Sequence, residues 1–126
     1  MKDKFAGKIA VVTGGSTGMG LSTAKRFVQE GMDHVFIIGR RKDTLDAAVA
    51  EIGKNVTGIQ GDVANLSDLD HLYDTVKKHN RPIDILFANA GVAKLAPFGT
   101  VNEEFFDLHF GANVRGLFFF VQKAFP

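Results

Sequence analysis

The feature that most constrains the fold is a regular alternation of short apolar runs with segments of helical periodicity. The apolar runs span 8–12, 34–38 and 83–87, and 56–60 is a weaker run between them. Runs of this length, rich in Val and Ile, are typical of strands buried on both faces of a parallel sheet. Between them, apolar residues recur every three to four positions, most clearly over 43–52. The order β-α-β-α-β-α-β-α predicts an α/β fold, a doubly wound parallel sheet with helices on both faces.

Glycine and capping residues predict where the helices end. Gly31 stands where a glycine would end the first helix, and Ser67 is the predicted N-cap of the third. The segment from about 102 to 125 predicts a last helix that is rich in phenylalanine. The apolar faces of the first and third helices consist of Leu21, Ala24 and Val28, and of Leu69, Leu72, Tyr73 and Val76.

Composition excludes several classes of function. A length of 126 residues predicts one domain, spanning 1–126. The formal net charge of +1 gives no electrostatic case for nucleic acid or an anionic membrane. With no cysteine there is no thiolate nucleophile and no Cys-type zinc site, and the four histidines share no ligand spacing, so no metal is expected. No signal peptide or membrane-spanning run is present in the sequence, and we expect a cytoplasmic location.

A glycine-rich loop joins the first predicted strand to the first predicted helix, with the sequence Thr13-Gly14-Gly15-Ser16-Thr17-Gly18-Met19-Gly20. Glycines permit positive φ and let backbone N–H groups approach a ligand closely. The helix that follows directs unpaired N–H groups and the positive end of its dipole at the same place. The loop therefore predicts a phosphate site, and a tight turn without a ligand is the alternative.

Two common phosphate-loop patterns do not fit this segment. The G-x-G-x-x-G fingerprint fails because Thr23 stands where its last small residue is required. A P-loop fits in its glycines and in Ser22, but Leu21 occupies the place of the lysine that reaches the β- and γ-phosphates. A nucleoside triphosphatase is therefore disfavoured.

The spacing T-G-x-x-x-G-x-G over 13–20 resembles the cofactor loop of the short-chain dehydrogenase/reductase family. Further segments resemble family motifs in the same order along the whole chain, with Ala88 in place of the first Asn of N-N-A-G. They are the opening 8–14, Gly61-Asp62-Val63, Ala88-Asn89-Ala90-Gly91 and Asn113-Val114-Arg115-Gly116. The resemblance implies a Rossmann-type fold that ends, in this chain, after strand four and its following helix.

The family resemblance also implies which residues contact a nicotinamide dinucleotide. Asp62 would accept a hydrogen bond from the adenine amine, although an Asp just past a strand can also serve as a helix cap. Asn89 would border the cofactor ribose and brace neighbouring strands. The implied cofactor-binding residues are Gly14, Ser16, Thr17, Gly18, Met19, Gly20, Asp62, Val63, Asn89, Ala90 and Gly91.

The residues about 20 positions past the loop distinguish NAD from NADP. Gly39, Arg40 and Arg41 stand there, and the nearest acidic residue, Asp43, falls in the next helix. A guanidinium donates two charge-assisted hydrogen bonds to a phosphate. The sequence therefore predicts NADP(H), with Arg40 as the first and Arg41 as the second ligand of the 2′-phosphate, whereas the alternative is two solvated loop charges.

The family catalyses hydride transfer between carbonyls and alcohols with a Ser and a Tyr-x-x-x-Lys pair. The chain contains one Tyr-x-x-x-Lys, from Tyr73 to Lys77, but it precedes Asn89, whereas the family's pair follows that motif. Tyr73 also lies on an apolar helix stripe, which is typical of core. Only Asn113 of the family's catalytic set is then present, and the chain is expected to be a cofactor-binding half without activity of its own. The alternative is a non-catalytic nucleotide-binding or interaction module.

The partners expected by resemblance are a small carbonyl or alcohol substrate, which the loop 92–100 could border, and a second copy of the chain. The last predicted helix carries phenylalanines all round, which must be covered on more than one side. The fourth strand would be an uncovered apolar edge. We therefore expect a homo-oligomer formed through that helix, the strand edge or both.

Overall fold

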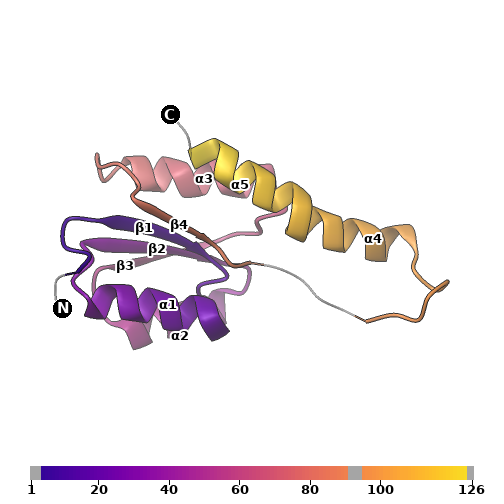
Figure 1. The fold of residues 1–126 in the computed structure, drawn as a ribbon, viewed down its shortest axis with the longest axis horizontal. Coiled ribbons are helices and arrows are strands. Elements are labelled where there is room, and N and C mark those ends of the chain that lie inside the picture. Colours follow the sequence, from indigo (N-terminus) through magenta and orange to yellow (C-terminus); the bar gives the residue numbers. More distant parts are fainter. Residues whose placement is uncertain (1–3, 91–94, 125–126) are drawn as a thin grey trace.

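The structure is a computed structural model that describes residues 4–90 and 95–124. Four parallel strands form one sheet in the order β3-β2-β1-β4 (Figure 1). The strands are β1 (Ile9–Thr13), β2 (His34–Gly39), β3 (Val56–Gln60) and β4 (Ile85–Ala88). The helices are α1 (Gly18–Gln29), α2 (Lys42–Ile52), α3 (Leu66–Lys77), α4 (Glu103–Phe110), the π-helical η1 (Gly111–Gly116) and α5 (Leu117–Ala124). The predicted doubly wound fold is confirmed.

Helices cover both faces of the sheet and enclose two separate apolar cores (Figure 1). Alternate residues of β1 enter different cores: Ile9 and Val11 face α3 and α5, whereas Ala10 and Val12 face α1 and α2. All five residues of β1 are buried, because a central parallel strand is covered on both sides.

Two predicted boundaries are wrong by two residues. The N-cap of α3 is Asn65 and not Ser67, since the Asn65 side chain accepts hydrogen bonds from the N–H groups of Ser67 and Asp68. The fourth strand begins at Ile85 rather than at residue 83. Asp84, just before it, is bonded to Ile9 instead, through both its backbone N–H and its carboxylate, each at 2.9 Å.

The last helical segment runs from Glu103 to Ala124 as predicted, but its middle is the π-helix η1. Both ends of η1 are glycines. A Cβ on Gly116 would lie 2.7 Å from the carbonyl oxygen of Val63, so only a glycine lets this turn approach the loop after β3 so closely. Sequence periodicity did not predict the wider π-helical turn, because this turn depends on a tertiary contact with the loop after β3.

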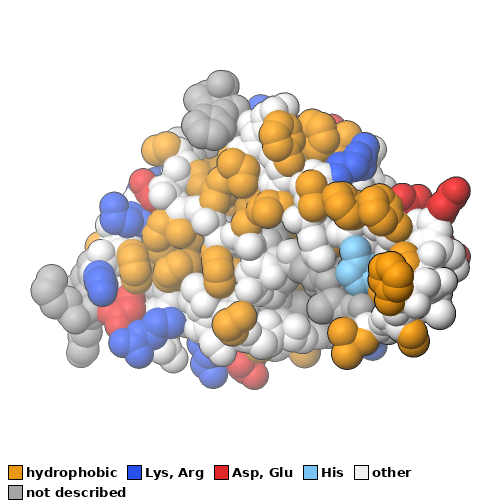
Figure 2. All heavy atoms as spheres, turned by 45° about the vertical axis from the view of Figure 1, so that its right-hand side comes forward, with side chains coloured by type: hydrophobic (Ala, Val, Ile, Leu, Met, Phe, Trp, Pro, Cys, Tyr) orange, Lys and Arg blue, Asp and Glu red, His pale blue; other side chains and the backbone are white. Residues whose placement is uncertain are grey.

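The phenylalanines of this segment are covered on one side only within the described chain. Phe120 is 1% exposed in the core beneath α5, whereas Phe106, Phe110 and Phe118 remain 52%, 49% and 57% exposed. Hydrophobic side chains gather in a band on the face shown in Figure 2. We call the exposed apolar residues of this segment the α4–α5 stripe; they are Phe106, Phe110, Val114, Leu117, Phe118 and Val121.

The fourth strand is an edge strand in the described part of the molecule, because β4 pairs with β1 on one side and with no described strand on the other. Within residues 4–90 and 95–124, no helix combines the length and the apolar character that crossing a membrane requires.

Candidate nucleotide-binding site

The carboxyl ends of the strands surround a cavity of about 380 Å³. It lies at β1, where the strand order reverses: β2 and β3 follow on one side of β1, and β4 lies on the other. Open α/β sheets bind their ligands at such a switch point. The lining residues are Gly14, Ser16, Thr17, Gly18, Met19, Ile38, Gly39, Arg40, Gly61, Asp62, Val63, Asn89, Ala90 and Ala112.

The glycine loop forms one wall of this cavity. Gly14 and Gly18 adopt positive φ, at 65° and 56°, which other residues rarely adopt. A Cβ on Gly18 would meet nothing within 4 Å, so the space in front of this backbone is open. No side chain caps the start of α1, and its first turn carries no acidic residue. The N–H groups there are therefore free of competing protein anions and suited to a phosphate.

Gly20 has a packing role that differs from the predicted ligand contact. It does not line the cavity, and a Cβ at this position would lie 2.0 Å from the carbonyl oxygen of Gly14. The residue lets the first turn of α1 pack directly against the back of the loop. Gly20 thus shapes the wall from behind.

A buried threonine, missed by sequence reasoning, holds the opposite wall. The Thr13 hydroxyl oxygen accepts hydrogen bonds from the N–H groups of Asn89 and Ala90, each at 2.9 Å, and the residue is 2% exposed. Gly14 packs against Ala90, with 3.1 Å between a Cβ built on the glycine and the Ala90 Cα. The end of β1 is thereby fixed to the end of β4. The predicted site residue Gly91 lies outside the described residues.

The turn after β3 supplies Asp62 and Val63 to the cavity, as the motif predicted. One carboxylate oxygen of Asp62 accepts from the N–H of Ala64 at 2.9 Å, and the N–H of Asp62 donates to Asp68 at 2.8 Å. A second hollow of about 290 Å³ shares Arg40, Gly61 and Asp62 with the first, so the cavity continues past this turn.

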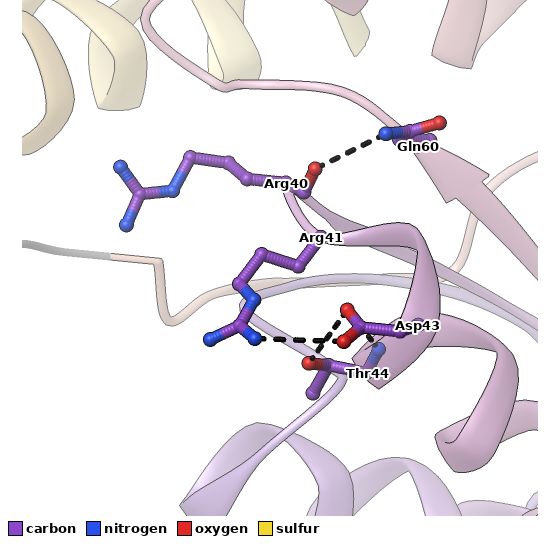
Figure 3. Close-up of polar contacts among 5 residues, drawn as sticks. All are labelled: Arg40, Arg41, Asp43, Thr44 and Gln60. Atoms are coloured by element: carbon purple, nitrogen blue, oxygen red, sulfur yellow. Dashed lines mark hydrogen bonds and ion pairs between the residues drawn. The ribbon is translucent and has the colours of Figure 1, made fainter.

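The two predicted arginines are neighbours that have different surroundings (Figure 3). Arg40 lines the cavity; its backbone oxygen accepts from Gln60, while its guanidinium has no recorded partner among the described residues. Arg41 is absent from the lining and contacts Asp43 at 3.5 Å, with both side chains largely exposed. Hydrogen bonding by the Thr44 N–H, followed by the charge of Arg41, lowers the pKa of Asp43. Arg40 is therefore the cation available to a ligand in the cavity.

The two predictions about catalytic residues concern Asn113 and Tyr73. Asn113 lies half-buried in η1, beside the lining residue Ala112 but not itself in the lining. Tyr73 is 5% exposed in the core, and its hydroxyl donates to the carbonyl oxygen of Phe120 at 2.6 Å. Burial raises the pKa of Tyr73. The interpretation of Tyr73 as a core residue is confirmed.

Sequence reasoning missed four lining residues: Ile38, Gly39, Gly61 and Ala112. Gly39 and Gly61 carry a detectable signal, since each is a glycine at the end of a predicted strand. Ile38 and Ala112 carry none, because they reach the cavity only through the packing of β2 and η1. Across 4–90 and 95–124, no group of three or more His, Asp or Glu side chains is arranged to hold a metal ion.

Comparisons with known proteins agree with this fold. A family model described as short chain dehydrogenase matches residues 8–126. The oxidoreductase asL5 of Sarocladium schorii is 47% identical over 123 residues, which are 98% of this chain and 49% of that protein.

Solved structures also match. The structure superposes with a TM-score of 0.90 on a 3-ketoacyl-(acyl-carrier-protein) reductase from Brucella melitensis complexed with NADH, at 32% identity, covering 98% of this chain and 50% of that one. The L-sorbose reductase of Gluconobacter frateurii, complexed with NADPH and L-sorbose, superposes with a TM-score of 0.88 at 28% identity. The match covers 97% of this chain and 48% of that one. The chain spans about half the length of the relatives it matches. With the family model matching nearly the whole chain, the protein belongs to the short-chain dehydrogenase/reductase family of oxidoreductases.

Proposed function

We propose that this chain forms the NADP(H)-binding part of an oxidoreductase that transfers hydride between a carbonyl and an alcohol. The observation that carries the choice of cofactor is Arg40. Arg40 lines the cavity just past the end of β2, and its guanidinium has no protein partner among the described residues (Figure 3). Its neighbour Gly39 carries no carboxylate.

The residues of the cavity fit such a nucleotide. The N–H groups at the start of α1 and the open backbone at Gly18 would hold the pyrophosphate. Asp62 has one carboxylate oxygen engaged by Ala64 and could accept from the adenine amine with the other. Asn89 and Ala90 would border the ribose on the nicotinamide side. When bound, the nicotinamide supplies or accepts the hydride.

The preference for a 2′-phosphate follows from charge. A ribose 2′-hydroxyl is usually held by an Asp or Glu at the end of the second strand, and a carboxylate there would repel a phosphate. Arg40 instead offers two parallel charge-assisted hydrogen bonds to phosphate oxygens. Among similar structures, the L-sorbose reductase was solved with NADPH and the ketoacyl reductase with NADH, so the relatives alone leave both cofactors open.

We further propose that the 126 residues bind the cofactor without catalysing hydride transfer. The sequence has a single tyrosine, and the hydroxyl of Tyr73 is engaged by the Phe120 carbonyl away from the cavity lining. A general acid must reach the reacting oxygen within hydrogen-bond distance. Asn113 is the one residue of the family's catalytic set in this chain, and we propose that it holds a catalytic water in the whole enzyme.

Titration of the chain with NADPH and NADH tests the proposed cofactor. We expect tighter binding of NADPH, and we expect Arg40→Ala to weaken NADPH binding about 10- to 100-fold, the range for loss of a charge-assisted hydrogen bond. NADH binding should stay nearly unchanged. Arg41→Ala is the matched control and should have little effect on either ligand. Equal binding of the two cofactors by the wild type would refute the assignment.

Gly39→Asp offers a test in the opposite direction. The new carboxylate would stand beside the 2′ position and should reverse the preference toward NADH. The backbone φ at Gly39 is not in the left-handed region, and a Cβ there would meet the flexible Ser16 hydroxyl at 3.0 Å, so the substitution requires only a side-chain shift. A folded Gly39→Asp variant that still prefers NADPH would argue against this use of the site.

A further inference from the structure

The turn that carries Asp62 into the cavity is stabilised from outside as well as from within. Internally, the N–H of Ala64 donates to the Asp62 carboxylate and the N–H of Asn65 donates to the Asp62 carbonyl, each at 2.9 Å. These short-range bonds fix the shape of turn 61–64. The N–H of Gly61 also donates to the carbonyl oxygen of Gly39 at 2.9 Å, which holds the start of the turn to the end of β2. None of these bonds holds residues 62–64 to the helices beside them, apart from the bond of Asn65 at the start of α3.

The first of two helices that hold the turn is α3, which acts through Asp68. This residue is the third of α3, and its carboxylate accepts from the N–H of Asp62 at 2.8 Å in a partly buried setting. In a capping box the residue at this place reaches back to the N-cap N–H. Here Asp68 reaches past the N-cap Asn65. A Cβ built on Gly61 would lie 3.0 Å from the Asp68 Cβ, so the carboxylate side chain also packs tightly against the turn.

The second is η1, which holds the turn through Arg115 and Gly116. Arg115 donates to the carbonyl oxygen of Ala64 at 3.0 Å, across 51 residues of sequence, and its guanidinium lies 5.9 Å from the centre of the Phe119 ring. The backbone at Gly116 closely approaches the carbonyl oxygen of Val63. The π-helix therefore contacts two successive carbonyls of the turn, while its own Ala112 lines the cavity.

We infer that Asp68 and Arg115 are positioning residues for nucleotide binding, which clamp turn 61–64 from two different helices and thereby hold Asp62 at the cavity wall. Arg115 lines neither hollow, and Asp68 lines only the second hollow, where its carboxylate is bonded to the Asp62 N–H. We therefore assign both residues an action through the turn. The inference rests on the proposed function, because it assigns the turn to the adenine side of the ligand. A turn held in place before binding loses less conformational entropy when the ligand binds.

The clamp predicts a selective loss of affinity for ligands that contain adenosine. In the chain of 126 residues, Asp68→Ala and Arg115→Met should each raise the Kd of adenosine 2′,5′-bisphosphate about tenfold, the effect of losing one hydrogen bond to a charged group. Binding of inorganic pyrophosphate to the glycine loop should change less than twofold. Because both substitutions loosen the same turn, the double variant should lose less affinity than the product of the single losses.

Conservative variants separate positioning from charge and from stability. Asp68→Asn keeps the acceptor and Arg115→Lys keeps a donor, so both should stay within about threefold of the wild type. Asp74→Ala on α3 and Arg26→Met on α1 remove a charge of the same sign away from the turn and serve as controls. All are compared by calorimetry at a temperature where circular dichroism shows each variant folded. The clamp inference is wrong if Asp68→Asn binds the bisphosphate as weakly as Asp68→Ala does. It is also wrong if both control variants weaken binding as much as Asp68→Ala and Arg115→Met do.

Amide hydrogen exchange tests the clamp without any ligand. In Asp68→Ala the Asp62 amide should exchange at least about tenfold faster, and in Arg115→Met the neighbouring amides of the turn should also exchange faster, while the β1 amides stay protected. Unchanged exchange in both variants would overturn the inference even if the wild type binds the nucleotide. A wild type that binds neither adenosine bisphosphate nor NADPH, but whose variants show faster exchange, would refute the proposed function instead and leave the clamp a purely structural device.

Discussion

Gly20 shows how much of the site depends on the absence of a single methyl group. The first turn of α1 and the start of the glycine loop approach so closely at this residue that a Cβ would overlap the Gly14 carbonyl. The loop can present its backbone to the cavity only because the helix start lies directly behind it. The same residue type therefore serves opposite purposes here, since Gly18 faces open space and Gly20 faces backbone.

Gly20→Ala should displace α1 from the loop and destabilise the fold by about 3 kcal/mol, the upper end of the usual cost of overpacking a rigid site. Urea unfolding followed by circular dichroism measures this change. The control is Gly111→Ala, where a Cβ would meet only the Ala64 Cβ at an ordinary 3.6 Å. A Gly20→Ala variant as stable as the wild type would contradict this explanation of the loop.

Tyr73→Phe should cost about 1.5 kcal/mol through loss of the hydrogen bond to the Phe120 carbonyl. The difference should depend on pH. Burial raises the pKa of Tyr73 above its ordinary value of 10.0, so stability is fully present below pH 10 and declines as the unfolded chain ionises above it. Unfolding at pH 8 and pH 10.5 should show the wild-type advantage shrinking. A constant difference would mean that the phenol is not buried in the way described.

At the scale of elements, the amino end of the sheet carries a pair of histidines that makes its stability sensitive to acid. His34 begins β2, its Nε2 lies 2.6 Å from the Thr57 hydroxyl on β3, and its ring centre lies 4.5 Å from that of His79 beyond α3. Partial burial, and then the nearby His79, lower the pKa of His34 below 6.5. The unfolded chain therefore takes up a proton more readily than the folded one as the pH falls.

His34→Gln should remove part of the acid sensitivity, because glutamine can still bond to Thr57 but does not titrate. For the wild type, the histidine contribution is present above pH 6.5 and is lost as the pH falls through the lowered pKa of His34. Thermal unfolding at pH 7.5 and pH 5.5 measures the effect. The exposed His71 on α3 provides the control, since His71→Gln should lose as much thermal stability between pH 7.5 and pH 5.5 as the wild type does. An equal loss of stability between the two pH values in all three proteins would show that His34 does not cause the acid sensitivity.

The elements also show where periodicity succeeds and where it fails. The apolar runs predicted all four strands. The pattern is strongest in β1 and β2, because a strand buried on both faces must be apolar along its length, and it is weaker in β3, which is only partly buried. The capping residue of α3 was misplaced because Ser67 and Asn65 are both suitable caps, and only the path of the chain after Val63 selects one of them. The π-helical turn was not predictable, since its cause is the backbone of a distant loop.

At the scale of the whole molecule, two surfaces lack a partner in the described chain: the free edge of β4 and the α4–α5 stripe. In the doubly wound order 3-2-1-4-5-6, a fifth strand lies beside the fourth. The relatives are about twice as long as this chain, so they have enough sequence for further strands beside the fourth. We propose that this chain of 126 residues associates with a second copy through the α4–α5 stripe, because contiguous exposed apolar side chains favour burial.

Association should be lost when charge is placed in the stripe. Phe110→Lys combined with Phe118→Lys should convert oligomers into monomers at micromolar concentration, since burying an unpaired ammonium opposes docking. Light scattering after size exclusion measures the mass. Glu104→Lys introduces the same group on α4 outside the stripe and should leave association intact. A wild type that is monomeric under these conditions would refute the proposal.

The sequence by itself determined the order of the elements, the family and the positions of the glycine loop and the strand-end motifs. These depend on local chemistry: buried strands must be apolar, and tight turns near a ligand need glycine. Only the tertiary structure decided that Arg40 and not Arg41 faces the cavity, that Gly20 supports the loop from behind, and that Tyr73 bonds to Phe120. Neighbours in sequence such as Arg40 and Arg41 are chemically identical, so their roles differ only through what the fold places beside each guanidinium.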